Sequence, residues 1–100
     1  MQRAIIIDDE QAGIETIKLL AARIPKLVKI VAATTDPAQG LLLVEDYRPD
    51  ILFLDVSMPG MNGFELLNRL SWRQFRLVFT TAHREYAINA IKQQAFDYLL

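Results

Sequence analysis

Three short apolar runs separated by helical patterns constrain the fold of this chain more than any other feature. The runs are Ala4–Ile7, Ile51–Leu54 and Leu77–Thr81. None of them alternates apolar and polar residues, which is typical of parallel strands with helices on both faces of the sheet. A weaker run at Lys29–Ala33 predicts another strand, and Asp97–Leu100 predicts the beginning of a fifth.

Apolar residues at helical spacing lie between these runs. The first helical pattern consists of Ile14, Ile17, Ala21 and Ile24, and Pro25 stops it. Asp36-Pro37 supplies an N-cap and a first residue for the second pattern. The second pattern places Ala38, Leu41 and Leu42 on one face. The predicted helices span residues 14–24, 37–47, 64–70 and 86–91.

The alternation of strands and helices predicts a doubly wound α/β fold with right-handed crossovers. One hundred residues suit one domain. Such a fold normally has a fifth helix after the fifth strand, and this chain stops at Leu100. We expect the sheet face near the third and fifth strands to stay exposed, so we predict a homodimer or a domain-swapped assembly.

Composition excludes several classes of function. The formal net charge of −1 gives no general attraction to nucleic acid or to an anionic membrane. The chain has no cysteine, which excludes disulfides, thiolate chemistry and cysteine-ligated zinc. No apolar run approaches the roughly 20 residues that span a bilayer. We expect a cytoplasmic protein that binds neither nucleic acid nor membrane directly.

Three carboxylates follow two of the predicted strands. Asp8 and Asp9 come directly after the run Ala4–Ile7, and Asp55 ends the run Ile51–Leu54. The carboxyl ends of parallel strands share one edge, where ligands bind. Two carboxylates about 5 Å apart repel by roughly 3 kcal/mol at an effective dielectric of 20, and a bound Mg²⁺ or Mn²⁺ removes that cost. The simpler interpretation is that Asp8 or Asp9 caps the following helix.

Asp55 is also a candidate nucleophile, since aspartyl phosphates are a known covalent route. Pro59 stiffens the loop after it, and Gly63 offers either a positive φ or a close backbone approach. This loop would direct a backbone carbonyl, that of Ser57, toward a metal. The alternative for Asp55 is an Asx-turn that only shapes the loop.

Hydroxyl and aromatic groups lie near the remaining strand ends. Thr81 could donate a hydrogen bond to a phosphoryl oxygen, or be there only for its strand propensity. Thr80 should point to the opposite face. His83, the single histidine, is more typical of an exposed loop residue than of a catalytic base. Tyr98 could lie in the core or at the rim.

Together these motifs resemble the receiver domain of two-component response regulators, over the whole chain. They are Ile7-Asp8-Asp9-Glu10, Asp55-x-x-Met58-Pro59-x-Met61-x-Gly63-x-Glu65-Leu66, Thr81-Ala82 and Asp97-Tyr98-Leu99-Leu100. The resemblance implies a flavodoxin-like, parallel five-stranded sheet of order 2-1-3-4-5, for which a chemotaxis receiver is a standard example. It also implies a regulatory phosphoacceptor, not an enzyme.

The resemblance further implies a role for each site residue. Asp55 would accept a phosphoryl group from a sensor histidine kinase. Asp9, Asp8, Asp55 and the Ser57 carbonyl would hold Mg²⁺. Thr81 and Tyr98 would form the switch, while Ser57 and His83 would flank the phosphate and tune its lifetime. The family's catalytic lysine follows the fifth strand and is not in this chain, so we expect slow or absent phosphorylation of residues 1–100 alone.

A narrower similarity concerns the output. The segments 79–83, 85–91 and 95–100 resemble LytR/AlgR-type regulators, whose LytTR domain binds DNA. Residues 1–100 would then be a receiver domain truncated at its C-terminus, without its output domain. The resemblance implies transcription regulation through that absent domain.

Three other functions fit parts of the pattern. An aspartate-nucleophile phosphatase or phosphotransferase would use Mg²⁺ in the same way, but typically has a second Asp where this chain has Ser57. An FMN-binding flavodoxin would need a phosphate loop where Asp8 and Asp9 would repel a phosphate. An interaction module without phosphorylation would not need the acidic residues.

Overall fold

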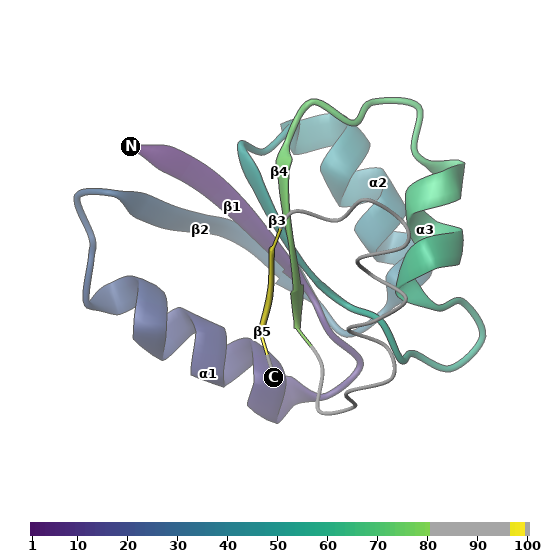
Figure 1. Cartoon of the computed structure of the whole chain (residues 1–100), viewed down its shortest axis with the longest axis horizontal. Coiled ribbons are helices and arrows are strands. Elements are labelled where there is room, and N and C mark those ends of the chain that lie inside the picture. Colours follow the sequence, from purple (N-terminus) through teal and green to yellow (C-terminus); the bar gives the residue numbers. More distant parts are fainter. Residues whose placement is uncertain (81–96, 100) are drawn as a thin grey trace.

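The computed structural model describes residues 1–80 and 97–99, and its central feature is one sheet of parallel strands (Figure 1). The strand order is β2-β1-β3-β4-β5. The bounds are β1 Gln2–Ile7, β2 Val28–Thr34, β3 Ile51–Asp55, β4 Arg76–Thr80 and β5 Asp97–Leu99. The predicted α/β, flavodoxin-like parallel architecture is therefore confirmed.

Three helices are described, and they lie on both faces of the sheet. They are α1 Gln11–Ala22, α2 Pro37–Tyr47 and α3 Gly63–Arg69. Figure 1 shows α1 on one face and α2 with α3 on the other. None of these three is long and apolar enough to cross a bilayer. The helix predicted at residues 86–91 lies outside the described residues.

The core is unequal on the two faces. Alternate residues of β1 divide between them, with Ile5 and Ile7 toward α2 and α3 and Ile6 toward α1. The larger cluster holds twelve buried residues, among them Phe79, which is fully buried. The smaller cluster holds three buried residues, of which Ile14 and Ile17 come from α1. Most of the hydrophobic stabilisation in the described chain therefore comes from the face of α2 and α3.

Two predicted helix faces are corrected by the structure. Ile24 lies beyond α1 and is 44% exposed, because the residue before a proline disfavours helical backbone. On α2, Leu42 is 67% exposed and Ala38 is exposed, while Gly40 and Val44 are buried. The missing side chain of Gly40 lets α2 pack closely on β1, and that contact turns Ala38 and Leu42 outward while Leu41 still packs on the larger core as predicted.

The edge strand β2 pairs with β1 through a shift in register. Ala4 pairs with Ile30, and Ile5 pairs with Ala32, so Val31 is an extra residue in β2. A bulge of this kind increases local twist and interrupts the flat edge that another chain could extend.

The loop between α3 and β4 is tied to α2 by a carboxylate. Both oxygens of Glu45 accept hydrogen bonds from Ser71, at 2.8 Å from its N–H and 2.7 Å from its hydroxyl. Trp72 and Phe75 pack against the larger core, and the centroids of their rings are 5.7 Å apart. These contacts fix the entry into β4 and hence its register beside β3.

Candidate metal and phosphoacceptor site

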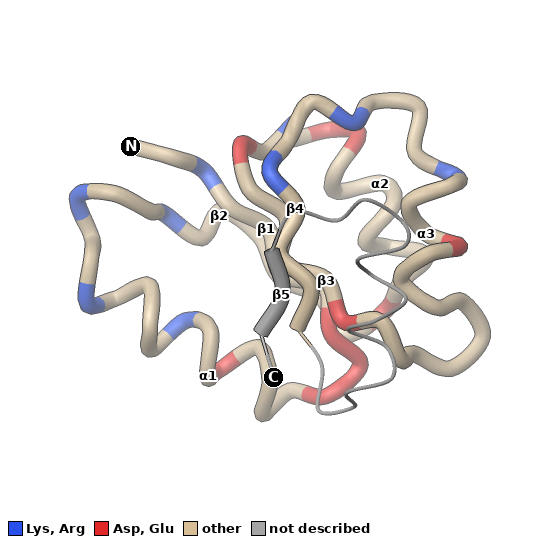
Figure 2. Tube along the Cα trace, in the orientation of Figure 1, with Lys and Arg blue, Asp and Glu red and all other residues tan. Residues whose placement is uncertain are grey.

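The sheet brings the three predicted carboxylates together. β1 and β3 are neighbours in register, with Ile7 opposite Leu54, so the residues after them emerge side by side. Asp8, Asp9 and Asp55 each offer an oxygen, and these oxygens all lie within 4.8 Å of one another. Figure 2 shows acidic segments gathered where β1 and β3 end. Asp8 is buried, and the other two are half-buried.

Two of these side chains also shape the loops that carry them. Asp8 Oδ1 accepts a hydrogen bond from the N–H of Glu10 at 2.9 Å. Asp55 Oδ1 accepts one from the N–H of Ser57 at 3.2 Å. The Asx-turn predicted as an alternative at Asp55 is therefore present, and each carboxylate keeps its second oxygen for other contacts. The helix-cap interpretation is wrong, since Glu10 occupies the N-cap of α1.

Two glycines make room for the carboxylates. A Cβ at Gly13 would overlap the Asp8 carboxylate, so this glycine lets the first turn of α1 pass close to it. A Cβ at Gly63 would lie 2.8 Å from the carbonyl oxygen of Asp55. Gly63 thus serves through close approach, and the positive φ of this loop belongs to Gly60 instead, at 80°. Sequence reasoning missed Gly13, because no recognised motif links a glycine at this spacing to Asp8.

The crowding of like charges changes the proton affinity of the site. Burial raises the pKa of Asp55 from its ordinary 3.8 to about 8, and a hydrogen bond with Asp9 and the charge of Asp8 act in the same direction. Burial also raises the pKa of Asp8, opposed by the hydrogen bond from the Glu10 N–H. Without a cation, the cluster therefore retains a proton near neutral pH.

The donor set fits a hard divalent cation. Its ligands are carboxylate oxygens, which Mg²⁺ and Mn²⁺ prefer, and the chain has no cysteine that would favour zinc. Within residues 1–80, no Lys or Arg forms an ion pair with the three carboxylates. A cation would therefore neutralise charge that the described residues leave unbalanced.

The other predicted site residues are only partly described. Thr81 and His83 lie outside the described residues. Tyr98 lies in β5 opposite Phe79, but its side chain is not described. Thr80 lies opposite Asp55 on the neighbouring strand, and its Oγ1 is buried without a hydrogen-bond partner. No motif in the sequence singles out this hydroxyl.

Comparisons with known proteins agree with this geometry. A family model described as the response regulator receiver domain matches residues 4–100. The chain is 39% identical to an uncharacterized response regulatory protein of Yersinia pestis over 103 residues, which is 42% of that protein. It is 37% identical to the transcriptional regulatory protein BtsR of Escherichia coli over 102 residues, again 42% of its length. The chain thus spans less than half of these curated relatives.

A solved structure extends the likeness to three dimensions. The REC domain of AraT, a response regulator from Geobacillus stearothermophilus, superposes with a TM-score of 0.84 at 32% identity. The match covers 99% of this chain and 80% of that one. Sequence, fold and carboxylate geometry lead to one conclusion: the chain belongs to the response regulator receiver domain family.

Proposed function

We propose that the chain is the phosphoryl-accepting switch of a two-component regulator, with Asp55 as acceptor and a sensor histidine kinase as donor. The observation that carries this proposal is the convergence of Asp8, Asp9 and Asp55 at the edge where β1 and β3 end. A nucleophilic carboxylate with a divalent-cation site beside it is what phosphoryl transfer to aspartate requires.

The chemistry expected of Asp55 follows from its position. Its free carboxylate oxygen would attack phosphorus, forming an oxygen–phosphorus bond as the bond to the kinase histidine nitrogen breaks and that nitrogen keeps the electron pair. The Ser57 N–H holds the other oxygen and orients the carboxylate. Because the pKa of Asp55 is raised, the metal-free carboxyl is largely protonated near neutral pH and is a poor nucleophile.

Asp8, Asp9, Asp55 and the Ser57 carbonyl would hold Mg²⁺. When bound, the ion neutralises charge on the carboxylates and on the transferred group. Asp9 and Asp8 would bind and orient it from the loop after β1. Thr81 and Tyr98 would relay the change to the surface, and Ser57 and His83 would set the lifetime of the phosphoryl group.

We propose in addition that residues 1–100 are the receiver part of a longer cytoplasmic transcription regulator. The relatives named as transcriptional regulatory proteins support this, and the LytTR-type output rests on resemblance alone. Ser57 offers no carboxyl to act as an acid or base, so we favour a regulatory phosphoacceptor over a phosphatase that turns over many substrate molecules.

The proposal is tested in the regulator that contains residues 1–100, incubated with acetyl phosphate and Mg²⁺. Intact-protein mass spectrometry should show one added phosphoryl group that requires Mg²⁺ and disappears in Asp55→Asn. The matched control is Asp50→Asn, which lies just before β3 at the end opposite Asp55, keeps an oxygen for the Arg3 N–H, and should label as the wild type does. Labelling that persists in Asp55→Asn would refute the assignment, and sustained phosphate release from small esters would favour the phosphatase.

A further inference from the structure

Two surfaces of opposite charge flank the free edge of β2. The basic surface is the end of α1 and its connection to β2, residues 18–29. The segment 16–35 carries four cations and no acid: Lys18, Arg23, Lys26 and Lys29. The acidic surface is the outward side of α2. Of the three acids in the segment 36–47, Asp36 caps the start of α2 and Glu45 is held by Ser71, so Asp46 is the acid that this surface exposes. Arg3 reaches the far end of the helix, where its guanidinium donates to the Tyr47 carbonyl at 2.9 Å. Figure 2 shows the cations of the first segment along the end of α1 and the turn that follows.

Both surfaces are also apolar. Within the described residues seven large hydrophobic side chains are exposed, and four of them lie on the basic surface: Leu19, Leu20, Ile24 and Leu27. Leu42 and Tyr47 lie on α2, and the remaining one is Met1 beside β2. Exposed apolar side chains gathered in this way mark an interface more often than scattered ones do.

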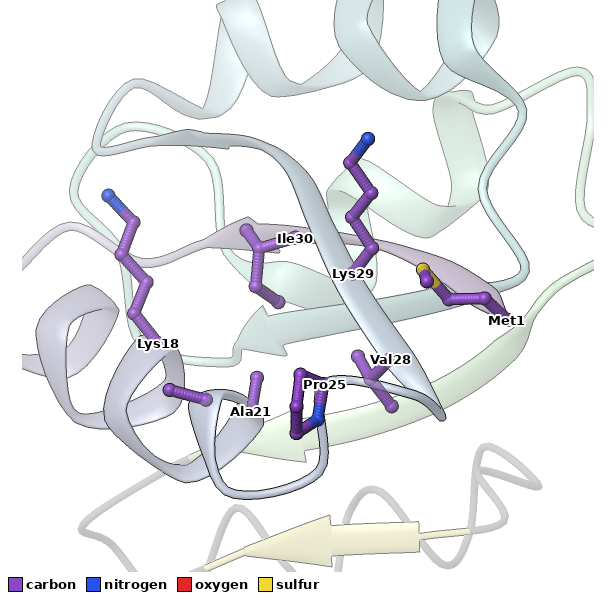
Figure 3. Close-up of a pocket in the computed structure, with 8 residues that line it drawn as sticks. Met1, Lys18, Ala21, Pro25, Val28, Lys29 and Ile30 are labelled. Atoms are coloured by element: carbon purple, nitrogen blue, oxygen red, sulfur yellow. The ribbon is translucent and has the colours of Figure 1, made fainter.

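A groove between α1 and β2 gives the basic surface its shape (Figure 3). Ala21, Pro25, Val28 and Ile30 form its apolar lining, and its volume is about 540 Å³. Figure 3 shows Lys18 and Lys29 extending away from this lining. A fitting occupant would insert an apolar side chain and place a carboxylate beside the cations.

The outward side of α2 has this chemistry. Leu42 is 67% exposed, and Asp46 lies one turn further along the same side of the helix. Within the described residues the one salt bridge joins Lys18 to Glu15 at 3.9 Å on the exposed side of α1, and Asp46 takes part in none. Glu45, by contrast, is engaged with Ser71 on the side of α3.

The topology lets two copies match these surfaces reciprocally. α1 and α2 each connect two parallel strands, so both helices run antiparallel to the strands. Both therefore end near the level at which the strands begin. A two-fold axis along the free edge of β2 exchanges the two faces of the sheet and keeps positions along the strands. It would therefore bring α2 of each copy against α1 of the other, with their C-terminal ends at the same height. Such an arrangement is self-complementary and closes as a dimer.

We propose that the chain forms this two-fold dimer, in which Leu42 and Asp46 of each copy dock on the groove and cations of residues 18–29 of the other. An anionic membrane fits less well, because the acidic side of α2 lies beside the same edge and would be repelled. The contact leaves the carboxyl ends of the strands, where Asp55 lies, accessible. The proposed dimer does not depend on the function proposed for Asp55.

Charge reversal and complementation test the dimer by sedimentation velocity across a concentration series. Lys18→Glu with Lys26→Glu should weaken association at least about tenfold, and so should Asp46→Lys. An equimolar mixture of the two variants should associate nearly as the wild type does, because both contacts in the mixed dimer then join opposite charges. Added salt should weaken the wild-type dimer.

The matched control is Arg69→Glu with Arg76→Glu, which makes the same change in net charge away from both surfaces and should associate as the wild type does. Melting curves verify that each variant folds, and rescue in the mixture itself requires both to be folded. A monomer at every concentration, or a mixture that stays monomeric, would overturn the proposal. So would a monomer that floats with phosphatidylglycerol vesicles, since that result assigns the basic surface to a membrane.

Discussion

Replacing Asp55 by Asn should stabilise the metal-free protein at alkaline pH. The folded-state pKa of Asp55 is raised to about 8, above the ordinary 3.8 that applies when the chain unfolds. Between these two values the folded state binds a proton that the unfolded state has released. Stability therefore falls as pH rises from about 4 to about 8 and then levels off. Asn keeps an oxygen for the Ser57 N–H but does not titrate, so it removes this loss.

The size of the effect follows from the pKa and the exposure of the group. A difference of one in pKa between the folded and unfolded states corresponds to about 1.4 kcal/mol of stability, so the raised pKa of Asp55 would cost about 6 kcal/mol if the carboxyl were fully buried. Asp55 is half-buried and solvent screens its neighbours, so about 2 kcal/mol is the reasonable expectation. In a domain of this size, that difference shifts the melting temperature by about 10 °C.

The assay is thermal and urea unfolding of both proteins in EDTA at about pH 5, 7 and 9, which runs from inside the range where Asp55 affects stability to above it. The wild type should lose stability across this series relative to Asp55→Asn, and the two should agree best at the acidic end. Millimolar Mg²⁺ should stabilise the wild type and do much less for the variant, because the ion binds the native carboxylates. A variant that is less stable than the wild type at pH 9 in EDTA would refute the electrostatic account.

Three further predictions concern residues that support the site and the core. The hydrogen bond from the Ser71 hydroxyl lowers the pKa of Glu45 below its ordinary 4.5, so the Glu45 carboxylate stabilises the folded state above that pH and stops doing so in acid. Glu45→Gln should therefore lower the melting temperature, followed by circular dichroism, at about pH 7 but not at about pH 3. Gly13→Ala should lower the free energy of unfolding by about 1–3 kcal/mol, because its Cβ overlaps the Asp8 carboxylate, and should weaken Mg²⁺ binding in calorimetry. An unchanged affinity for Mg²⁺ would show that the position of Asp8 does not control the metal site. Phe79→Ala, at a fully buried position, should cost about 3–5 kcal/mol in urea denaturation, and a loss below 1 kcal/mol would contradict the described core.

The sequence predicted the elements whose signals are local and strong. The unbroken apolar runs identified β1, β3 and β4, and the Asp36-Pro37 pair identified the start of α2, where Asp36 accepts the N–H of Ala38 at 3.0 Å. The meeting of the three carboxylates was predictable because parallel strands end at one edge. Their roles stay predictions.

Other features depend on contacts between distant segments and could not be predicted. The exposure of Leu42 follows from Gly40 packing against Ile7, and no pattern within α2 reveals that neighbour. The close fit of Gly13 to Asp8 and the tie between Glu45 and Ser71 likewise join residues whose spacing carries no recognised motif.

The unequal core has a consequence for how the native protein opens. α1 is anchored in the smaller cluster by Ile14 and Ile17, whereas α2 and α3 share the larger one. Helices held by fewer buried contacts detach at a lower free energy than the whole domain unfolds. Amide protons of α1 should therefore exchange with solvent before those of β1 and β3. Because Asp8 and Asp9 lie in the loop that leads into α1, a ligand bound by them would slow that exchange along the whole helix.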